Sequence, residues 1–162
     1  MITPTQRSAN MAAIHSRDTK PELAVRKALF ALGFRYRVAP KALKGRPDLV
    51  FAKYKAVVFI HGCFWHGHWC PAYRQPKSNG YFWAQKIYRN RTRDHDDVVR
   101  LLELGWRVAI VWECATKGSK KSNPLPTTIT TLAAWLTSTE AELELPPLRP
   151  PTVVWPSATG LP

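Results

Sequence analysis

Residues 56–70 constrain the fold more than any other part of this chain. Residues 56–60 form a short apolar run, which is typical of a buried strand. The run leads into the sequence HGCFWHGHWC, which holds three histidines, two cysteines and three large aromatic residues. About ten residues upstream, Asp48 opens a second short apolar run. Strand ends that carry metal ligands and acid–base groups indicate a metal-dependent enzyme rather than a plain binding domain.

Hydrophobic periodicity predicts an α/β domain, a mixed sheet flanked by helices. The sequence TKPE at 19–22 predicts a capping box that opens a first helix, which ends at Gly33. Strands are expected at 35–38, 49–51, 56–60 and 107–112, and helices at 81–104 and, more weakly, 127–137. The length of 162 residues suits one domain, which we place at 19–137. Residues 1–18 would form a polar, basic arm, and 138–162 a proline-rich, flexible tail.

The charge balance predicts a polyanionic partner. The chain carries a formal net charge of +13 and a pI near 10.1. Nucleic acid is the leading candidate because phosphate contacts dominate the binding of basic proteins to DNA and RNA. An acidic membrane surface is less favoured, since no basic amphipathic helix is evident and no apolar run approaches the roughly 20 residues of a membrane span. The N-terminus lacks an apolar signal region, so a cytoplasmic location is expected.

The cysteines suggest a metal site. Cys63, His68 and Cys70 form a C-x4-H-x-C pattern, and Cys114 follows a later predicted strand that could lie beside the first. Three cysteines cannot all pair, and a Cys₃His set suits structural zinc, because four protein ligands leave no open position. The alternative is that Cys63 and Cys114 are ordinary core cysteines. On spacing alone, His66 could replace His68 as a ligand.

A second group suggests catalysis. Asp48 follows Pro47 at the start of a strand, where a carboxylate could hold Mg²⁺. His61 and His66 offer a general base and a proton donor that faces phosphate. Taken singly, an aspartate before a strand is more often a turn or cap residue, and a lone histidine is more often structural. Clustering of all three near one strand end favours a catalytic site.

The chain resembles the very short patch repair (Vsr) DNA mismatch endonucleases. The matching motifs are MAAI at 11–14, GRPD at 45–48, FIHGCFWH at 59–66, FW at 82–83, ELGWRV at 103–108 and VWEC at 111–114. Together they cover about residues 8–135. The family implies a restriction-endonuclease-like fold and a Mg²⁺-dependent enzyme that nicks one DNA strand 5′ of the thymine in a T:G mismatch.

The resemblance also implies roles for single residues. Asp48 matches the Mg²⁺ carboxylate, and Ile60 stands where the family usually has a threonine whose main-chain carbonyl is a metal ligand. His66 resembles the base that activates water, and His61 the histidine that assists at the scissile phosphate. Glu22 and Asp94 match acidic residues near the site. The implied zinc ligands are Cys63, His68, Cys70 and Cys114.

Four further residues match side chains that wedge between bases, namely Met11, Phe64, Trp65 and Trp83. Flanked by polar residues, Phe64 and Trp65 are expected to be exposed rather than core aromatics. Arg89, Arg91 and Arg93 would then contact phosphates, although by themselves they would indicate only a solvated helix face. The expected enzyme is monomeric, and mismatch-repair proteins are partners by resemblance alone. Two alternatives remain: a restriction-like or homing nuclease with another DNA target, and a non-catalytic, zinc-stabilised DNA-binding module.

Overall fold

The computed structural model describes residues 3, 5–6, 17–71, 73–74, 76, 78–118 and 122–147. Their sheet has five strands in the order β1-β2-β3-β4-β5. The pairs β1–β2 and β2–β3 are antiparallel, whereas β3–β4 and β4–β5 are parallel, so the sheet is mixed. The strands are β1 (Arg37–Val38), β2 (Leu49–Phe51), β3 (Ala56–His61), β4 (Arg107–Trp112) and β5 (Glu142–Leu145).

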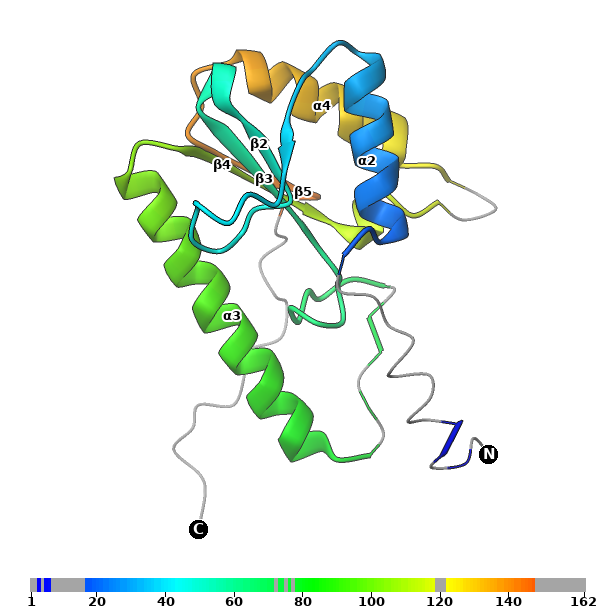
Figure 1. Ribbon diagram of the computed structural model, residues 1–162. Helices are drawn as coiled ribbons and strands as arrows, with labels where there is room; N and C mark the ends of the chain where they lie inside the picture. Colours follow the sequence, from blue (N-terminus) through cyan, green and yellow to red (C-terminus); the bar gives the residue numbers. More distant parts are fainter. Residues whose placement is uncertain are drawn as a thin grey trace.

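Helices cover both faces of the sheet (Figure 1). Helices α2 (Lys20–Ala31) and α4 (Leu125–Thr137) pack on one face, and α3 (Gly80–Glu103) packs on the other. Side chains alternate along β3, so that Val58 and Ile60 join the α2/α4 layer while Val57 and Phe59 join the α3 layer. This arrangement confirms the predicted α/β class with a mixed sheet flanked by helices.

Helix α3 is longer than the sheet needs. Its C-terminal half packs through the buried Leu101, and its N-terminal half runs beyond the strands (Figure 1). The segment after β3 lies against this helix, where Asn90 donates a 2.8 Å hydrogen bond to the carbonyl of Trp65. A Cβ on Gly67 would come within 2.5 Å of Ile87 Cγ2, which explains why glycine stands there. Over the described residues, no helix has the length and apolarity to cross a membrane.

The largest correction to the sequence analysis concerns β5. Residues 142–145, assigned there to the flexible tail, form a strand parallel to β4. The alternation Glu-Leu-Glu-Leu explains it, since Leu143 and Leu145 pack into the α2/α4 core layer. The sequence carries this signal, but the alternating run is only four residues long and is followed directly by prolines.

Smaller differences lie at the ends of elements. The strand expected at 35–38 is confined to Arg37–Val38, and α4 begins at Leu125 rather than 127. The capping box is incomplete, because the Thr19 side chain makes no cap hydrogen bond. Instead, Glu22 accepts hydrogen bonds from the Thr19 hydroxyl at 2.8 Å and from the Asp18 backbone N–H at 3.0 Å.

Candidate active site and metal centre

The carboxylate of Asp48 meets the main chain of β3. Its Oδ2 accepts a 2.6 Å hydrogen bond from the backbone N–H of Ile60, which joins the start of β2 to the end of β3. The Ile60 side chain is buried in the core layer beneath α2 and α4. Ile60 therefore contributes backbone to the site and its side chain to the core.

His61 and His66 lie beside this carboxylate. Their rings stack in parallel, with centroids 3.9 Å apart and an interplanar angle of 2°. Asp94 of α3 forms a short hydrogen bond through Oδ2 to His66 Nδ1. A carboxylate at Nδ1 holds the proton there and leaves the Nε2 lone pair of the neutral ring free. The geometry thus leaves His66 Nε2 available to accept a proton.

The donor atoms of His61, His66 and Asp94 all lie within 4.8 Å of one another. Parallel stacked rings direct their in-plane lone pairs along separate planes, so both imidazoles cannot converge on one ion in this arrangement. The geometry supports acid–base work by these three residues more than chelation.

An open pocket of about 580 Å³ contains this group. Asp48, His61, His66 and Asp94 line it, as does Glu22 from α2. Its cationic lining residues are Lys44, Arg46, Arg93 and Arg100. Basic side chains around a cluster of carboxylates and imidazoles suit a substrate with phosphates on either side of the reacting group.

Glu22 differs from Asp48 in its partners. Besides its bonds at the start of α2, its Oε2 lies 2.8 Å from Arg26 Nη2, and both side chains are buried. Arg26 also forms a short ion pair with Asp18. The Glu22 carboxylate is thus tied to the first turn of α2. Its place in the pocket agrees with the expected position near the site, while its bonds point to a structural role.

Burial shapes the electrostatics of the pocket. It raises the pKa of Asp48 from 3.8 to about 6, against the lowering effect of the Ile60 hydrogen bond. Burial, reinforced by the nearby charge of His66, lowers the pKa of His61 to about 3. For Asp94, burial acts upward, but the hydrogen bond and charge of His66 prevail and lower its pKa. A raised carboxylate pKa marks a site that a cation would stabilise.

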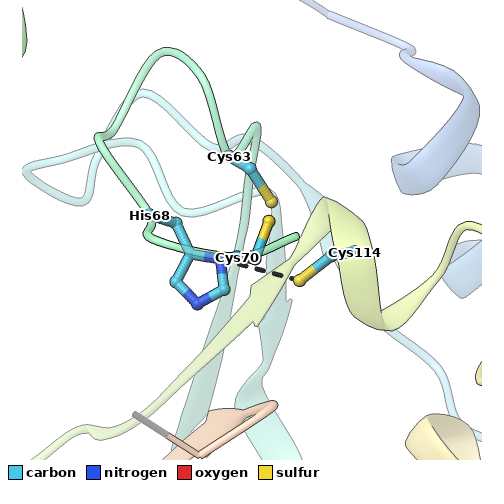
Figure 2. Close-up of side chains that lie close together, drawn as sticks. All are labelled: Cys63, His68, Cys70 and Cys114. Atoms are coloured by element: carbon cyan, nitrogen blue, oxygen red, sulfur yellow. Dashed lines mark hydrogen bonds between the residues drawn. The ribbon is translucent and has the colours of Figure 1, made fainter. Parts of the chain in front are cut away.

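Cys63, His68, Cys70 and Cys114 converge in a second cluster (Figure 2). The first three come from the segment after β3, and Cys114 comes from the turn after β4. All four donor atoms lie within 4.8 Å of one another, and Cys114 Sγ is 3.6 Å from His68 Nδ1. Zinc–sulfur bonds of about 2.3 Å would place tetrahedral ligand atoms roughly 3.8 Å apart, so the set fits such an ion.

Thiol ionisation in this cluster also fits a metal site. A hydrogen bond from Cys114, aided by others from His68 and Cys70, lowers the pKa of Cys63 to about 5 despite burial. The same bond to Cys63, together with burial, raises the pKa of Cys114. A second thiolate is therefore unfavourable unless a cation compensates its charge. Of the two histidines left open by spacing, His68 joins the cysteines, while His66 pairs with Asp94.

The predicted wedge residues form one aromatic cluster. The Phe64 ring centroid lies 5.1 Å from those of both Trp65 and Trp83. Lys86 Nζ lies 5.4 Å from the Trp65 centroid and 5.5 Å from that of Trp83, at cation–π range. All three aromatics are half-buried. Phe64 and Trp65 are therefore less exposed than expected, although neither belongs to the two core clusters. Met11 lies outside the described residues.

Two residues that sequence reasoning did not single out connect these clusters. The Trp112 ring stacks on His68 at 4.3 Å and 9° and meets His61 edge-on at 5.4 Å. Glu144 of β5 accepts a 2.6 Å hydrogen bond from Trp112 Nε1. Trp112 ends a predicted strand beside Cys114, which was the available signal. For Glu144 the available signal was the Glu-Leu-Glu-Leu alternation of residues 142–145, which the assignment of this segment to the tail left unused.

The fold and site define a class of protein: a nuclease with a carboxylate and an aspartate-oriented histidine at one end of a mixed sheet. Comparison with known proteins makes this specific. The family model "DNA mismatch endonuclease Vsr" matches residues 1–72. The DNA mismatch endonuclease Vsr of Escherichia coli is 49% identical over 115 residues, which are 71% of this chain and 74% of that protein.

Two other relatives are nicking enzymes. The type II nicking enzyme V.NmeAIP of Neisseria meningitidis is 51% identical over 117 residues, covering 72% of this chain and 84% of the relative. The type II nicking enzyme V.XorIIP of Xanthomonas oryzae is 45% identical over 113 residues, or 70% and 83% of the two chains. The chain belongs to the Vsr family of DNA mismatch endonucleases. This confirms the predicted family and disfavours the non-catalytic module.

Proposed function

We propose that this enzyme nicks DNA on the 5′ side of the thymine in T:G mismatches and requires Mg²⁺. The observation that carries the proposal is one pocket that joins Asp48, the Ile60 backbone and the His66–Asp94 pair beneath a cationic rim. The names of the relatives support mismatch or nicking activity. The T:G target and the cut position rest on the family resemblance.

In the proposed reaction, His66 is the general base. Asp94 holds the proton on Nδ1, so Nε2 can accept a proton from the water that attacks phosphorus. As the new bond to phosphorus forms, the bond from phosphorus to the 3′ oxygen breaks and that oxygen leaves. The Asp94 carboxylate then stabilises the imidazolium that forms. The hydrogen bond between the two side chains orients the His66 ring before substrate arrives.

His61 has a different task. Because burial lowers its pKa to about 3, the ring is neutral at physiological pH. It can therefore donate a hydrogen bond to a phosphate oxygen without carrying a charge. This refines the expectation of a proton donor at the phosphate, since an uncharged N–H orients the phosphate rather than neutralising it.

Two metals enter the proposal. Mg²⁺ would be held by Asp48 and the Ile60 carbonyl, and when bound it supplies positive charge to the phosphate oxygens. Asp48 fits that ion because burial has already made its charge unfavourable. Zn²⁺ would be held by the Cys63, His68, Cys70 and Cys114 cluster as a structural ion, and the convergence of the four donor atoms within 4.8 Å of one another supports it.

The aromatic cluster supplies a way to select mismatches. A mismatched step is easier to unstack than a paired one, so Phe64, Trp65 and Trp83 could open it at lower cost. Lys86, held over the same rings, brings positive charge to the place where backbone phosphates would pass. We propose that the enzyme acts as a monomer in the cytoplasm, where thiols stay reduced. Mismatch-repair proteins are proposed partners.

A nicking assay on strand-labelled duplexes tests the proposal. The duplexes carry a T:G mismatch, another mismatch or full pairing in otherwise identical sequences, with Mg²⁺ present or absent. We expect a single cut 5′ of the mismatched thymine, only with Mg²⁺. Cutting of the paired duplex at an equal rate would instead favour the related nuclease with a different target. Absence of any cut with every divalent metal would overturn the proposal.

A metal analysis tests the zinc assignment separately. One zinc per chain is expected in the purified protein, and replacement of Cys70 by serine should remove most of it. Asp48→Asn serves as the matched control, because it changes the other proposed metal position and should retain the zinc. A protein that lacks zinc yet folds and nicks normally would contradict the assignment.

A further inference from the structure

Trp112 forms a wall between the Cys/His cluster and the proposed catalytic histidines. It lies at the end of β4 and is only 7% exposed. One contact is the parallel stack on His68, and the others are edge contacts to His61 at 5.4 Å and His66 at 6.4 Å. His61 and Trp112 are also paired directly across β3 and β4. The position of the indole therefore bears on both clusters.

The His61 ring depends on such contacts for its orientation. Within the described part of the chain, ring packing holds it, with Phe59 at 5.6 Å, His66 at 3.9 Å and Trp112 at 5.4 Å, and no hydrogen bond reaches its nitrogens. An imidazole held only by packing turns more easily than one held by hydrogen bonds. The orientation of the His61 ring toward a phosphate is thus set by the rings packed around it.

Each of two neighbours is in turn fixed by a carboxylate. Asp94 of α3 bonds His66, and Glu144 of β5 accepts the 2.6 Å hydrogen bond from Trp112 Nε1. Hydrogen bonds to ionised acceptors are stronger than neutral ones, so both supports are firm. Glu144 lies opposite Ile110 in the β4–β5 register, on the same face of the sheet as Trp112 and His61. Asp94 therefore supports the His61 ring through His66, and Glu144 supports the same ring through Trp112.

We propose that Glu144 is a positioning residue of the nicking reaction, which fixes the Trp112 indole and thereby holds the His61 ring against His66. The inference rests on the proposed function for its catalytic consequence, but not for its structural one. It makes β5 part of the active-site framework, although no residue of β5 lines the pocket.

Steady-state nicking kinetics of the full-length enzyme test the catalytic consequence. Glu144→Ala should lower kcat at least tenfold and leave KM for mismatched DNA within twofold. Glu144→Gln should recover kcat to within threefold of wild type, because its amide oxygen still accepts the indole N–H. Glu142→Ala is the matched control, since it removes an exposed carboxylate from the same strand and should not change kcat.

A double-mutant cycle tests the route of the effect. Trp112→Phe keeps an aromatic ring but removes the donor, and it should itself lower kcat. In that background, Glu144→Ala should lower kcat by no more than a further twofold. A full tenfold loss there, or a Glu144→Ala enzyme with the kcat of Glu142→Ala, would overturn the inference.

Histidine NMR of the free protein separates this inference from the proposed function. Ring resonances of His61, assigned from a His61→Gln sample, should shift in Glu144→Ala and Trp112→Phe and stay unchanged in Glu142→Ala. If the wild-type enzyme failed to nick any substrate, the proposed function would fall, yet these shifts would still decide whether Glu144 holds His61. Unmoved His61 resonances in a folded, zinc-loaded Glu144→Ala protein would refute it.

Discussion

At the scale of single residues, the ionised carboxylate of Asp48 suits a cation site but lowers the stability of the fold. Its pKa is raised from 3.8 to about 6, so between these pH values the folded protein holds a proton that the unfolded chain has released. Stability therefore falls as pH rises through this window and stays lower above it. The ionised carboxylate is unfavourable to folding until a cation binds beside it.

Asp48→Asn should consequently stabilise the metal-free protein at pH 8. The shift corresponds to roughly 1–3 kcal/mol after allowance for partial exposure to solvent, and the amide oxygen can still accept the Ile60 N–H. Urea unfolding after dialysis against metal-free buffer should show this gain at pH 8 and almost none at pH 4. A gain of equal size at both pH values would contradict the charge argument.

His61 does not disturb this comparison. Its pKa is lowered to about 3 from 6.5, so the protein loses stability as pH falls through that range. The loss occurs in both wild type and Asp48→Asn and cancels in their difference.

Added Mg²⁺ should raise the unfolding midpoint of the wild type and leave that of the Asp48→Asn variant unchanged, because only the wild type keeps the charged ligand.

Asp94 is the residue whose charge matters most to the proposed base. Asp94→Asn removes the charge that stabilises the His66 imidazolium and lets an amide N–H face Nδ1, which would favour the wrong tautomer. We expect kcat for nicking to fall on the order of 10²- to 10⁴-fold, with DNA affinity within threefold of wild type. Asp96→Asn, an exposed position two residues along α3, is the control. An Asp94→Asn enzyme as fast as this control would exclude His66–Asp94 as the base.

At the scale of elements, the segment between β3 and α3 joins the chemistry to the fold. It carries Phe64, Trp65, His66 and His68, and it lies against α3 through Gly67 and the Asn90–Trp65 bond. Gly67 has φ of +63°, a conformation that favours glycine, and a Cβ there would clash with Ile87. Both conditions must hold for this segment to lie close to the helix.

Gly67→Ala and Gly33→Ala separate these two conditions. Gly33 also has positive φ, at +89°, but a Cβ there would meet nothing within 4 Å. Chemical denaturation should show a loss of about 1 kcal/mol for Gly33→Ala and roughly 2–4 kcal/mol for Gly67→Ala, which adds the contact with Ile87. Only Gly67→Ala should also reduce nicking. Equal losses in both variants would show that the segment can move away from α3 without penalty.

Sequence patterns predicted most elements because each carries a strong local signal. The apolar run of β3, the long helix α3 and the strand β4 were found within a residue or two. The Cys/His set and the Asp48, His61 and His66 group were also predicted, since adjacent strand ends bring them together. What could not be predicted were contacts set by packing between elements, such as the aromatic stack of His68, Trp112 and His61. The role of β5 could not be predicted for the same reason. Its sequence signal is only four alternating residues, and these are recognisable as a strand only once β4 lies beside them.

At the scale of the whole molecule, charge is the dominant property. A net charge of +13 favours the binding of a polyanion to any part of the surface. The structure, however, distinguishes the α3 face of the sheet from the α2 face. Arg89, Arg93 and Arg100 lie on α3, the helix that contributes Asp94 to the pocket. Lys27 lies exposed on α2, across the sheet. DNA bound at the pocket should contact the first group and not the second.

The salt dependence of DNA affinity tests this distinction. Each phosphate neutralised by a basic side chain contributes a slope of about −0.9 to log K against log salt. For the wild type we expect a total slope of about −5 or steeper, measured by fluorescence anisotropy with a mismatched duplex and no Mg²⁺. Arg89→Ala should reduce the steepness by about 0.9, whereas Lys27→Ala removes the same charge and should leave the slope unchanged. If both variants flattened the slope equally, the net charge rather than the α3 face would govern binding, and the pocket would not fix where the duplex lies.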